Sequence, residues 1–132
     1  MGYQEIEHTG DCAMRVWGID LGGLFTEAAR GLYQLSGARL GTGREVRERV
    51  SLRASDIEGL LVAFLSELIY LQEHRGLGFD EFDLDVRERW LTGTMTGRDL
   101  IEVAQPLKAV TYHGLQIEHS HPQYSCEVVF DA

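Results

Sequence analysis

The chain has 132 residues and a formal net charge of −9, and 44% of its residues are hydrophobic. This length suits one domain, residues 1–132, around a single hydrophobic core. The acidic charge repels polyanions at long range, which disfavours direct, tight binding of nucleic acid. There is no apolar run near the roughly 18 residues of a membrane helix. Residues 1–6 lack the basic start and apolar core of a signal peptide, so we expect a cytoplasmic protein with no membrane partner.

The first third of the chain predicts two strands and a helix. The strands are expected over Tyr3–His8 and Ala13–Gly18. Apolar residues then recur at helical spacing over Leu21–Ser36. Asp20 before this helix is a suitable N-cap, and Gly37 after it is a suitable end.

Residues 46–53 predict a half-buried strand. Apolar side chains alternate there with Arg47, Arg49 and Arg53, which gives the strand a cationic outer face. These arginines could contact a partner or RNA. A solvated face beside acidic neighbours is the more common arrangement, and it is the interpretation that we favour.

A second helix is predicted behind the capping box of Ser55 and Glu58, and it extends to about Glu73. It is apolar around nearly its whole circumference, which is typical of a helix buried between layers. Glu67 within it needs a polar partner. This residue is either a satisfied core carboxylate or part of a polar site.

The second half of the chain predicts mainly strands. A turn is expected at Gly97–Asp99, and a hairpin is expected before the final strand. The expected strands cover Phe82–Val86, Trp90–Thr96, Leu107–Glu118 and Tyr124–Asp131. Two helices and mostly late strands indicate an α+β fold, with the helices packed on mostly antiparallel sheet.

Acidic groups stand at structural ends of the chain. Asp11 lies in the tight corner between the first two strands, and Asp131 precedes Ala132, whose α-carboxylate adds another anionic group. If Asp11 folds close to them, three hard oxygen donors converge, a set that suits Ca²⁺ or Mg²⁺. On spacing alone, a turn aspartate and a solvated tail are the simpler explanation.

Three further residues are candidates for a site. Lys108 is the only lysine among twelve basic residues. It remains either by chance or because a compact ammonium cannot be replaced there by a planar guanidinium. His113 is expected on the apolar face of its strand, as a satisfied core histidine. His8 could orient a metal ligand or simply bond to neighbouring backbone.

In chain order, several of these segments resemble the archease family. His8–Asp11 is similar to the family's N-terminal His-Thr-Ala-Asp, and residues 108–115 are close to its hallmark strand. Phe130–Asp131 resembles the family's ending. Archeases assist RtcB-type RNA ligases, which act in tRNA splicing and RNA repair. The resemblance therefore implies a non-enzymatic activator that promotes guanylylation of such a ligase and its multiple turnover.

The resemblance also implies a metal site and a role for the single lysine. It assigns a divalent cation to Asp11, Asp131 and Ala132, with calcium first and magnesium or manganese as alternatives. It implicates Lys108 in activation. Around such a site, the candidates for supporting positions are His8, Glu67 and His113.

Two other functions stay open at this point. A metal-dependent phosphoesterase that uses Asp11, Asp131 and Glu67 would turn over a phosphate ester without any partner. A general chaperone or interaction module with a structural metal would act on unrelated clients and would tolerate Asp131→Asn.

Overall fold

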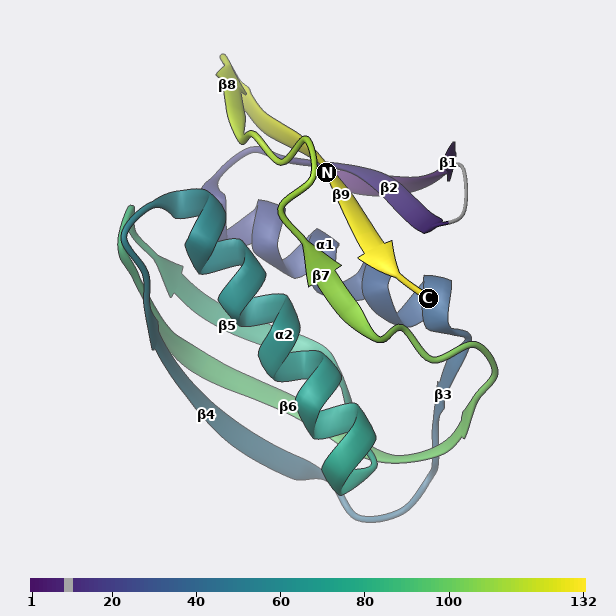
Figure 1. Ribbon diagram of the computed structural model, residues 1–132. Coiled ribbons are helices and arrows are strands. Elements are labelled where there is room, and N and C mark those ends of the chain that lie inside the picture. Colours follow the sequence, from purple (N-terminus) through teal and green to yellow (C-terminus); the bar gives the residue numbers. More distant parts are fainter. Residues whose placement is uncertain (9–10) are drawn as a thin grey trace.

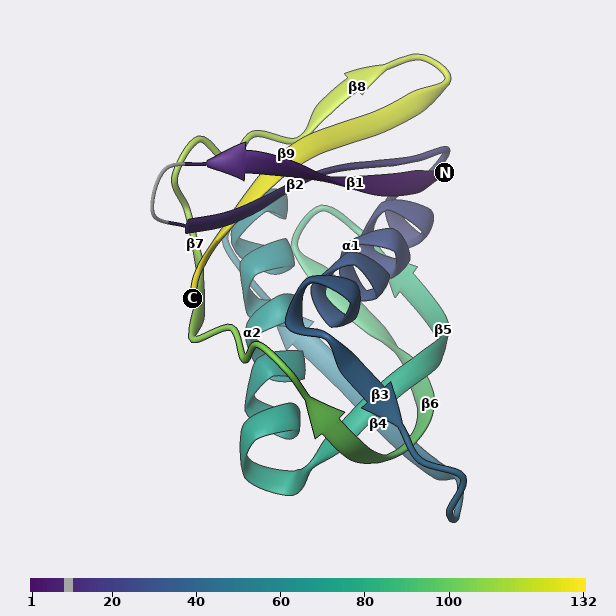
Figure 2. The same ribbon diagram turned by 90° about the vertical axis from the view of Figure 1, so that its right-hand side faces the viewer.

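Two helices lie between two antiparallel sheets in the computed structural model, which describes residues 1–8 and 11–132 and their side chains except those of residues 7, 8 and 11. Figures 1 and 2 show α1 (Leu21–Ser36) and α2 (Ile57–Arg75) in the middle layer. Buried side chains from both helices and both sheets form one hydrophobic core. The predicted α+β class, with two helices on antiparallel sheet, is confirmed.

The first sheet has five strands, with β9 at its centre. One side of β9 pairs with β2, which pairs in turn with β1. The other side pairs with β7 near the end of β9 and with β8 near its start. The bounds are β1 Gly2–His8, β2 Asp11–Gly18, β7 Ala109–Thr111, β8 Glu118–Ser120 and β9 Gln123–Asp131.

The second sheet has four strands, with the long strand β6 at its centre. It pairs with β5 on one side. On the other side, the first part of β6 pairs with β4 and its last part pairs with β3. The bounds are β3 Ala38–Leu40, β4 Val46–Arg53, β5 Leu77–Val86 and β6 Trp90–Val103. The sheet closes the core from the side opposite β9.

The outer face of the second sheet carries parallel rows of arginine, threonine and acid. Arg49 on β4 lies opposite Thr94 on β6, and Thr94 lies opposite Asp83 on β5. Arg47 and Arg49 are exposed, and no ion pair joins them to a described carboxylate. An acidic row two strands away is the arrangement expected of a solvated face.

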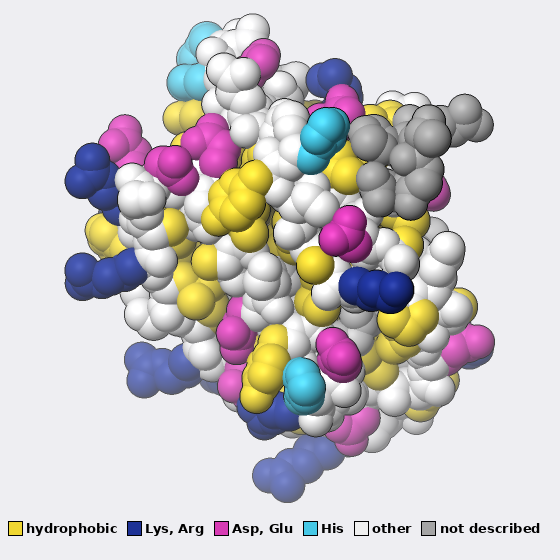
Figure 3. Space-filling model, in the orientation of Figure 1, with side chains coloured by type: hydrophobic (Ala, Val, Ile, Leu, Met, Phe, Trp, Pro, Cys, Tyr) yellow, Lys and Arg dark blue, Asp and Glu magenta, His cyan; other side chains and the backbone are white. Residues whose placement is uncertain are grey.

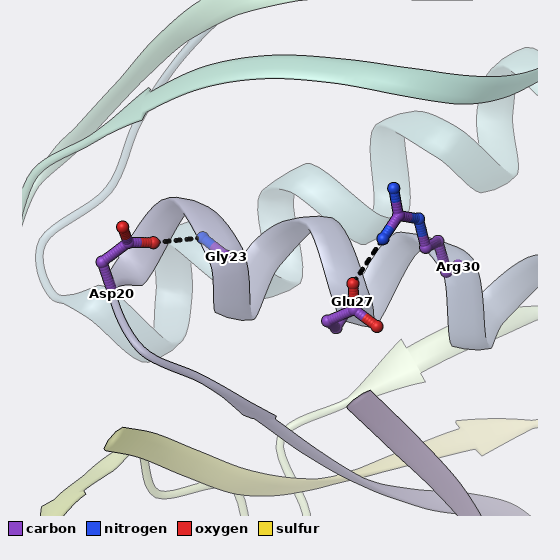
Figure 4. Close-up of polar contacts among 4 residues, drawn as sticks. All are labelled: Asp20, Gly23, Glu27 and Arg30. Atoms are coloured by element: carbon purple, nitrogen blue, oxygen red, sulfur yellow. Dashed lines mark hydrogen bonds and ion pairs between the residues drawn. The ribbon is translucent and has the colours of Figure 1, made fainter. Parts of the chain in front are cut away.

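Helix α1 begins and ends where the sequence predicts. The Asp20 carboxylate accepts a hydrogen bond from the Gly23 N–H at 2.6 Å, and Gly37 ends the helix with a φ of 63°. Figure 4 shows this cap and, one turn further on, the pair between Glu27 and Arg30 at 2.6 Å. Glu27 is buried, so this pairing satisfies a carboxylate that would otherwise be costly to bury.

Helix α2 lies between the two sheets, as its apolar circumference predicts, but its cap is one residue later than expected. The Asp56 carboxylate, not the Ser55 hydroxyl, accepts the Gly59 N–H at 2.7 Å. The Glu58 carboxylate instead accepts the Ile117 N–H at 2.9 Å. Glu58 therefore ties the start of α2 to the segment before β8 and takes no part in a capping box.

The turn predicted at Gly97–Asp99 is wrong, because β6 continues through these residues to Val103. Gly97 is buried, and a Cβ there would collide with the backbone of Gly78 and Phe79 on β5. Glycine stands at this position so that two strands can approach closely. The sequence signal was therefore real, but its cause was strand packing and not a turn.

The single strand predicted over Leu107–Glu118 is also wrong. Strand β7 stops at Thr111 and β8 begins at Glu118, with a turn between them at Gly114, whose φ is 63°. Leu115 in this segment still packs against the core, which explains the misleading alternation. His113 is exposed in the turn and is not a core histidine.

Candidate functional site

Three strand ends meet at one end of the five-stranded sheet. Cys12 on β2 lies opposite Phe130 on β9, and Ala109 on β7 lies opposite Asp131. Asp11 precedes Cys12 and Asp131 follows Phe130, so both stand at the ends of neighbouring strands, whose backbones are about 5 Å apart in a sheet. Figure 1 shows the C-terminal end of β9 beside the start of β2. The fold thus brings together the backbones of both predicted acidic ligands.

Lys108 stands next to Asp131 on the other side of β9. Its backbone N–H donates a hydrogen bond to the Asp131 carbonyl oxygen at 2.8 Å. The preceding residue, Leu107, is only 3% exposed and anchors the segment in the core. Two residues further back, the Gln105 N–H donates to the Ser36 carbonyl oxygen at 2.9 Å. The backbone of Lys108 is therefore held firmly while its side chain is exposed.

The side chain of Asp131 faces solvent. Phe130 is fully buried, and strand alternation turns the next side chain to the opposite face of the sheet. Asp131 and Ala132 are both exposed. No ion pair joins Asp131 or Lys108 to a described side chain, so both charges remain available to a ligand or partner.

The predicted supporting residues differ in what the structure shows of them. The side chains of His8 and Asp11 lie outside the described residues, so their roles stay predictions. Glu67 is half-buried on α2 and makes no hydrogen bond or ion pair with a described residue, so its interpretation as a satisfied core carboxylate is wrong. His113 lies in the turn after β7, where its N–H donates to the Thr111 hydroxyl at 3.3 Å.

The ligand set for a metal ion remains a prediction. Among the described side chains, no three His, Cys, Asp or Glu residues gather into a group that could hold a metal. The side chain of Asp11 is not one of those described, so this finding leaves the predicted set of Asp11, Asp131 and Ala132 untested. Carboxylate oxygens are the donors that Ca²⁺ and Mg²⁺ prefer, whereas Zn²⁺ prefers His and Cys.

An apolar groove of about 370 Å³ opens beside Lys108, and no sequence pattern predicts it. The lining comes from α2, from the end of β6 and from the segment before β7. It includes Ile69, Val103 and Leu107, with the charged residues Glu73 and Lys108. Because these residues come from three separated segments and form no motif, only the fold could reveal the groove.

The Archease protein family model matches residues 3–132, nearly the whole chain. The chain belongs to the archease family. It is 31% identical to the Protein archease of Methanopyrus kandleri and 30% identical to that of Archaeoglobus fulgidus, and each alignment covers 99% of both chains. The resemblance drawn from the sequence segments is thereby confirmed.

Two solved structures share the fold. A crystal structure from Thermotoga maritima, described as an archease and possible chaperone, has a TM-score of 0.73 at 25% identity and covers 98% of this chain and 96% of its own. The solution structure of a Methanobacterium thermoautotrophicum protein has a TM-score of 0.72 at 20% identity and covers 99% of each chain. In the described part of this family member, no helix is both long and apolar enough to span a membrane.

Proposed function

We propose that this protein activates an RtcB-type RNA ligase, promoting transfer of GMP from GTP to the ligase and supporting multiple turnover. The observation that carries the proposal is the junction of β2, β9 and β7, where the Lys108 N–H bonds to the Asp131 carbonyl oxygen. Membership of the archease family supports it. The protein acts as an accessory factor and performs no covalent chemistry of its own.

In this proposal the acidic strand ends hold a divalent cation. Asp11, Asp131 and Ala132 are the ligands, and calcium is the first candidate, with magnesium or manganese as alternatives. Their oxygen donors fit a hard cation. When bound, the cation would supply positive charge where phosphate groups must be neutralised.

Lys108 supplies a second positive charge. Guanylyl transfer depends mainly on positioning and on neutralising charge on phosphate oxygens. The backbone bond to Asp131 and the buried Leu107 fix where the lysine side chain starts, so less freedom is lost when its ammonium meets a phosphate. The ammonium is a compact point charge, which a planar guanidinium does not reproduce.

The partner is expected to be basic. A ligase that binds RNA needs clustered cations, and a surface with a net charge of −9 attracts them. The same charge opposes tight contact between this protein and the RNA itself. The protein therefore acts on the ligase and not on its RNA substrate.

An RNA-ligation assay with substoichiometric ligase tests the proposal. Adding the protein should raise product well above one equivalent of ligase. Lys108→Ala and Lys108→Arg should both abolish this gain, whereas Arg49→Ala, which removes an exposed arginine on the far sheet, should preserve it. Product that stays at one equivalent with the wild-type protein would refute the proposed function.

Calorimetry with Ca²⁺ tests the cation site separately. Asp131→Asn should weaken binding by at least tenfold, because a ligand carboxylate is lost from a small set. Asp80→Asn, at an exposed aspartate on β5, is the matched control and should bind like the wild type. Equal affinities for the two variants would remove Asp131 from the ligand set.

A general chaperone role is the second candidate, favoured by the description of the Thermotoga maritima relative as a possible chaperone. It predicts protection of an unrelated aggregating client, and this protection should survive Asp131→Asn. The phosphoesterase alternative predicts turnover of a simple phosphate ester by the protein alone. Neither activity is expected if the protein is a dedicated ligase activator.

A further inference from the structure

The groove beside Lys108 is lined by side chains from three segments of the chain. Ile69 on α2 and Leu107 before β7 are both almost fully buried, and Val103 at the end of β6 is half-buried. The main uncharged polar side chain of the groove is that of Gln72. It already has a partner within the protein, because its amide donates a hydrogen bond to the Ser36 hydroxyl at 3.4 Å. The groove surface that remains accessible to a partner is therefore mainly apolar.

Two charged side chains flank the groove without an ion pair among the described residues. Glu73 and Lys108 are both exposed, and neither forms an ion pair with a described side chain. A partner group that is apolar at its centre and carries complementary charges beside it would match these lining residues. If Lys108 contacts a phosphate, as the proposed function holds, the Glu73 carboxylate remains available to pair with a cationic side chain of the partner.

We propose that the groove receives one apolar side chain of the ligase, of leucine or phenylalanine size, from a segment that also brings a cationic side chain to Glu73. This inference rests on the proposed function. Lys108 belongs both to the groove and to the strand junction, so a ligase surface that reaches Lys108 also covers the groove. The volume of about 370 Å³ is small for a ligand pocket but ample for a single large side chain.

The surroundings of the groove suit a protein interface. Buried apolar anchors surrounded by polar rims carry most of the binding energy in protein complexes. Figure 3 shows this face of the molecule, where hydrophobic side chains are interspersed with acidic ones over α2 and β7. A basic partner with one protruding apolar side chain matches both features.

The test is the dissociation constant for the RtcB-type ligase of the same organism, measured by calorimetry without GTP. Val103→Arg should place a long cationic side chain in the groove and weaken binding by about tenfold to hundredfold, the value of one buried side chain. The matched control is Ile101→Arg, at a 63% exposed position on the same strand that does not line the groove. This variant should bind like the wild type.

A second variant tests the groove independently, in case Val103→Arg disturbs the fold. Glu73→Arg changes an exposed residue without an ion pair to a described side chain, so the fold should be unaffected. It should weaken binding several-fold and flatten the salt dependence. The control is Glu88→Arg, in the loop between β5 and β6.

The outcomes separate this inference from the proposed function. If Val103→Arg and Ile101→Arg bind the ligase equally well while Lys108→Ala still loses activation, the groove proposal fails and the proposed function stands. If the wild-type protein neither binds nor activates the ligase, both fail. If Val103→Arg instead abolishes self-association in sedimentation experiments and leaves ligase affinity intact, the occupant is a second copy and the proposal is overturned.

Discussion

Replacing Gly97 with alanine tests whether β6 runs through this residue. The new Cβ would meet the carbonyl oxygen and carbon of Gly78 and the Cα of Phe79, all of them backbone atoms of a paired strand. Backbone cannot rotate away as a side chain can, so β5 and β6 must separate locally. Overpacking costs about 1–3 kcal/mol, and weakening two ladder hydrogen bonds costs about 1 kcal/mol each. Gly97→Ala should therefore lower the free energy of unfolding by about 3–5 kcal/mol.

Gly43→Ala is the control for this substitution. Gly43 does not have a positive φ, and nothing lies within 4 Å of a Cβ built on it. Alanine there should leave the protein unchanged or stabilise it by up to about 1 kcal/mol, by restricting the unfolded chain. Urea denaturation followed by circular dichroism measures both values. If the two variants differ by less than about 0.5 kcal/mol, Gly97 lies in an open turn and the strand assignment is refuted.

Three further predictions concern the helix cap, a buried thiol and the arginine row. Asp56→Ala should cost about 1 kcal/mol of unfolding free energy and Ser55→Ala under about 0.5 kcal/mol, and a larger loss for Ser55→Ala in urea titrations would return the cap to Ser55. Burial, with the nearby Glu58 charge, raises the pKa of Cys126 from 9.0 to about 12. The neutral thiol thus favours the folded state below pH 9, and this stability is lost as pH rises to 12. Cys126→Ala should flatten the decline in melting temperature between these values, and an unchanged decline would contradict the assignment. Arg49→Ser should change the free energy of unfolding by less than about 0.5 kcal/mol at any salt concentration, because the exposed arginine side chain makes no ion pair with a described residue. A larger loss would show that Arg49 makes a stabilising contact.

The helices were predictable because their signals are local. Leu21–Ser36 combines a helical apolar period with a capping aspartate and a left-handed glycine, and the structure has the same bounds. The burial of α2 followed from its apolar circumference. Its cap was missed because Ser55 and Asp56 are both suitable N-caps, and only the backbone geometry shows which of them accepts the Gly59 N–H.

The errors fall where one local signal has two physical causes. Glycine permits a turn, but it also permits two strands to approach closely, and Gly97 serves the second purpose. Likewise, alternating apolar residues over 107–118 reflect contacts with the core made from an irregular segment, not one continuous strand. Long-range packing decides between such alternatives, and a single sequence does not contain it in readable form.

The candidate site shows the same division between local and long-range information. The sequence indicates which residues carry charge, but only the register of β2, β9 and β7 shows that Asp11, Asp131 and Lys108 occupy adjacent positions. That register is fixed by buried strand residues such as Phe130 on β9 and Val110 on β7, since a slip of one residue would turn these apolar side chains to solvent. The core residues beside the site thus hold the lysine and the aspartate together, and their precise packing is as much a requirement for the proposed activity as the charges themselves.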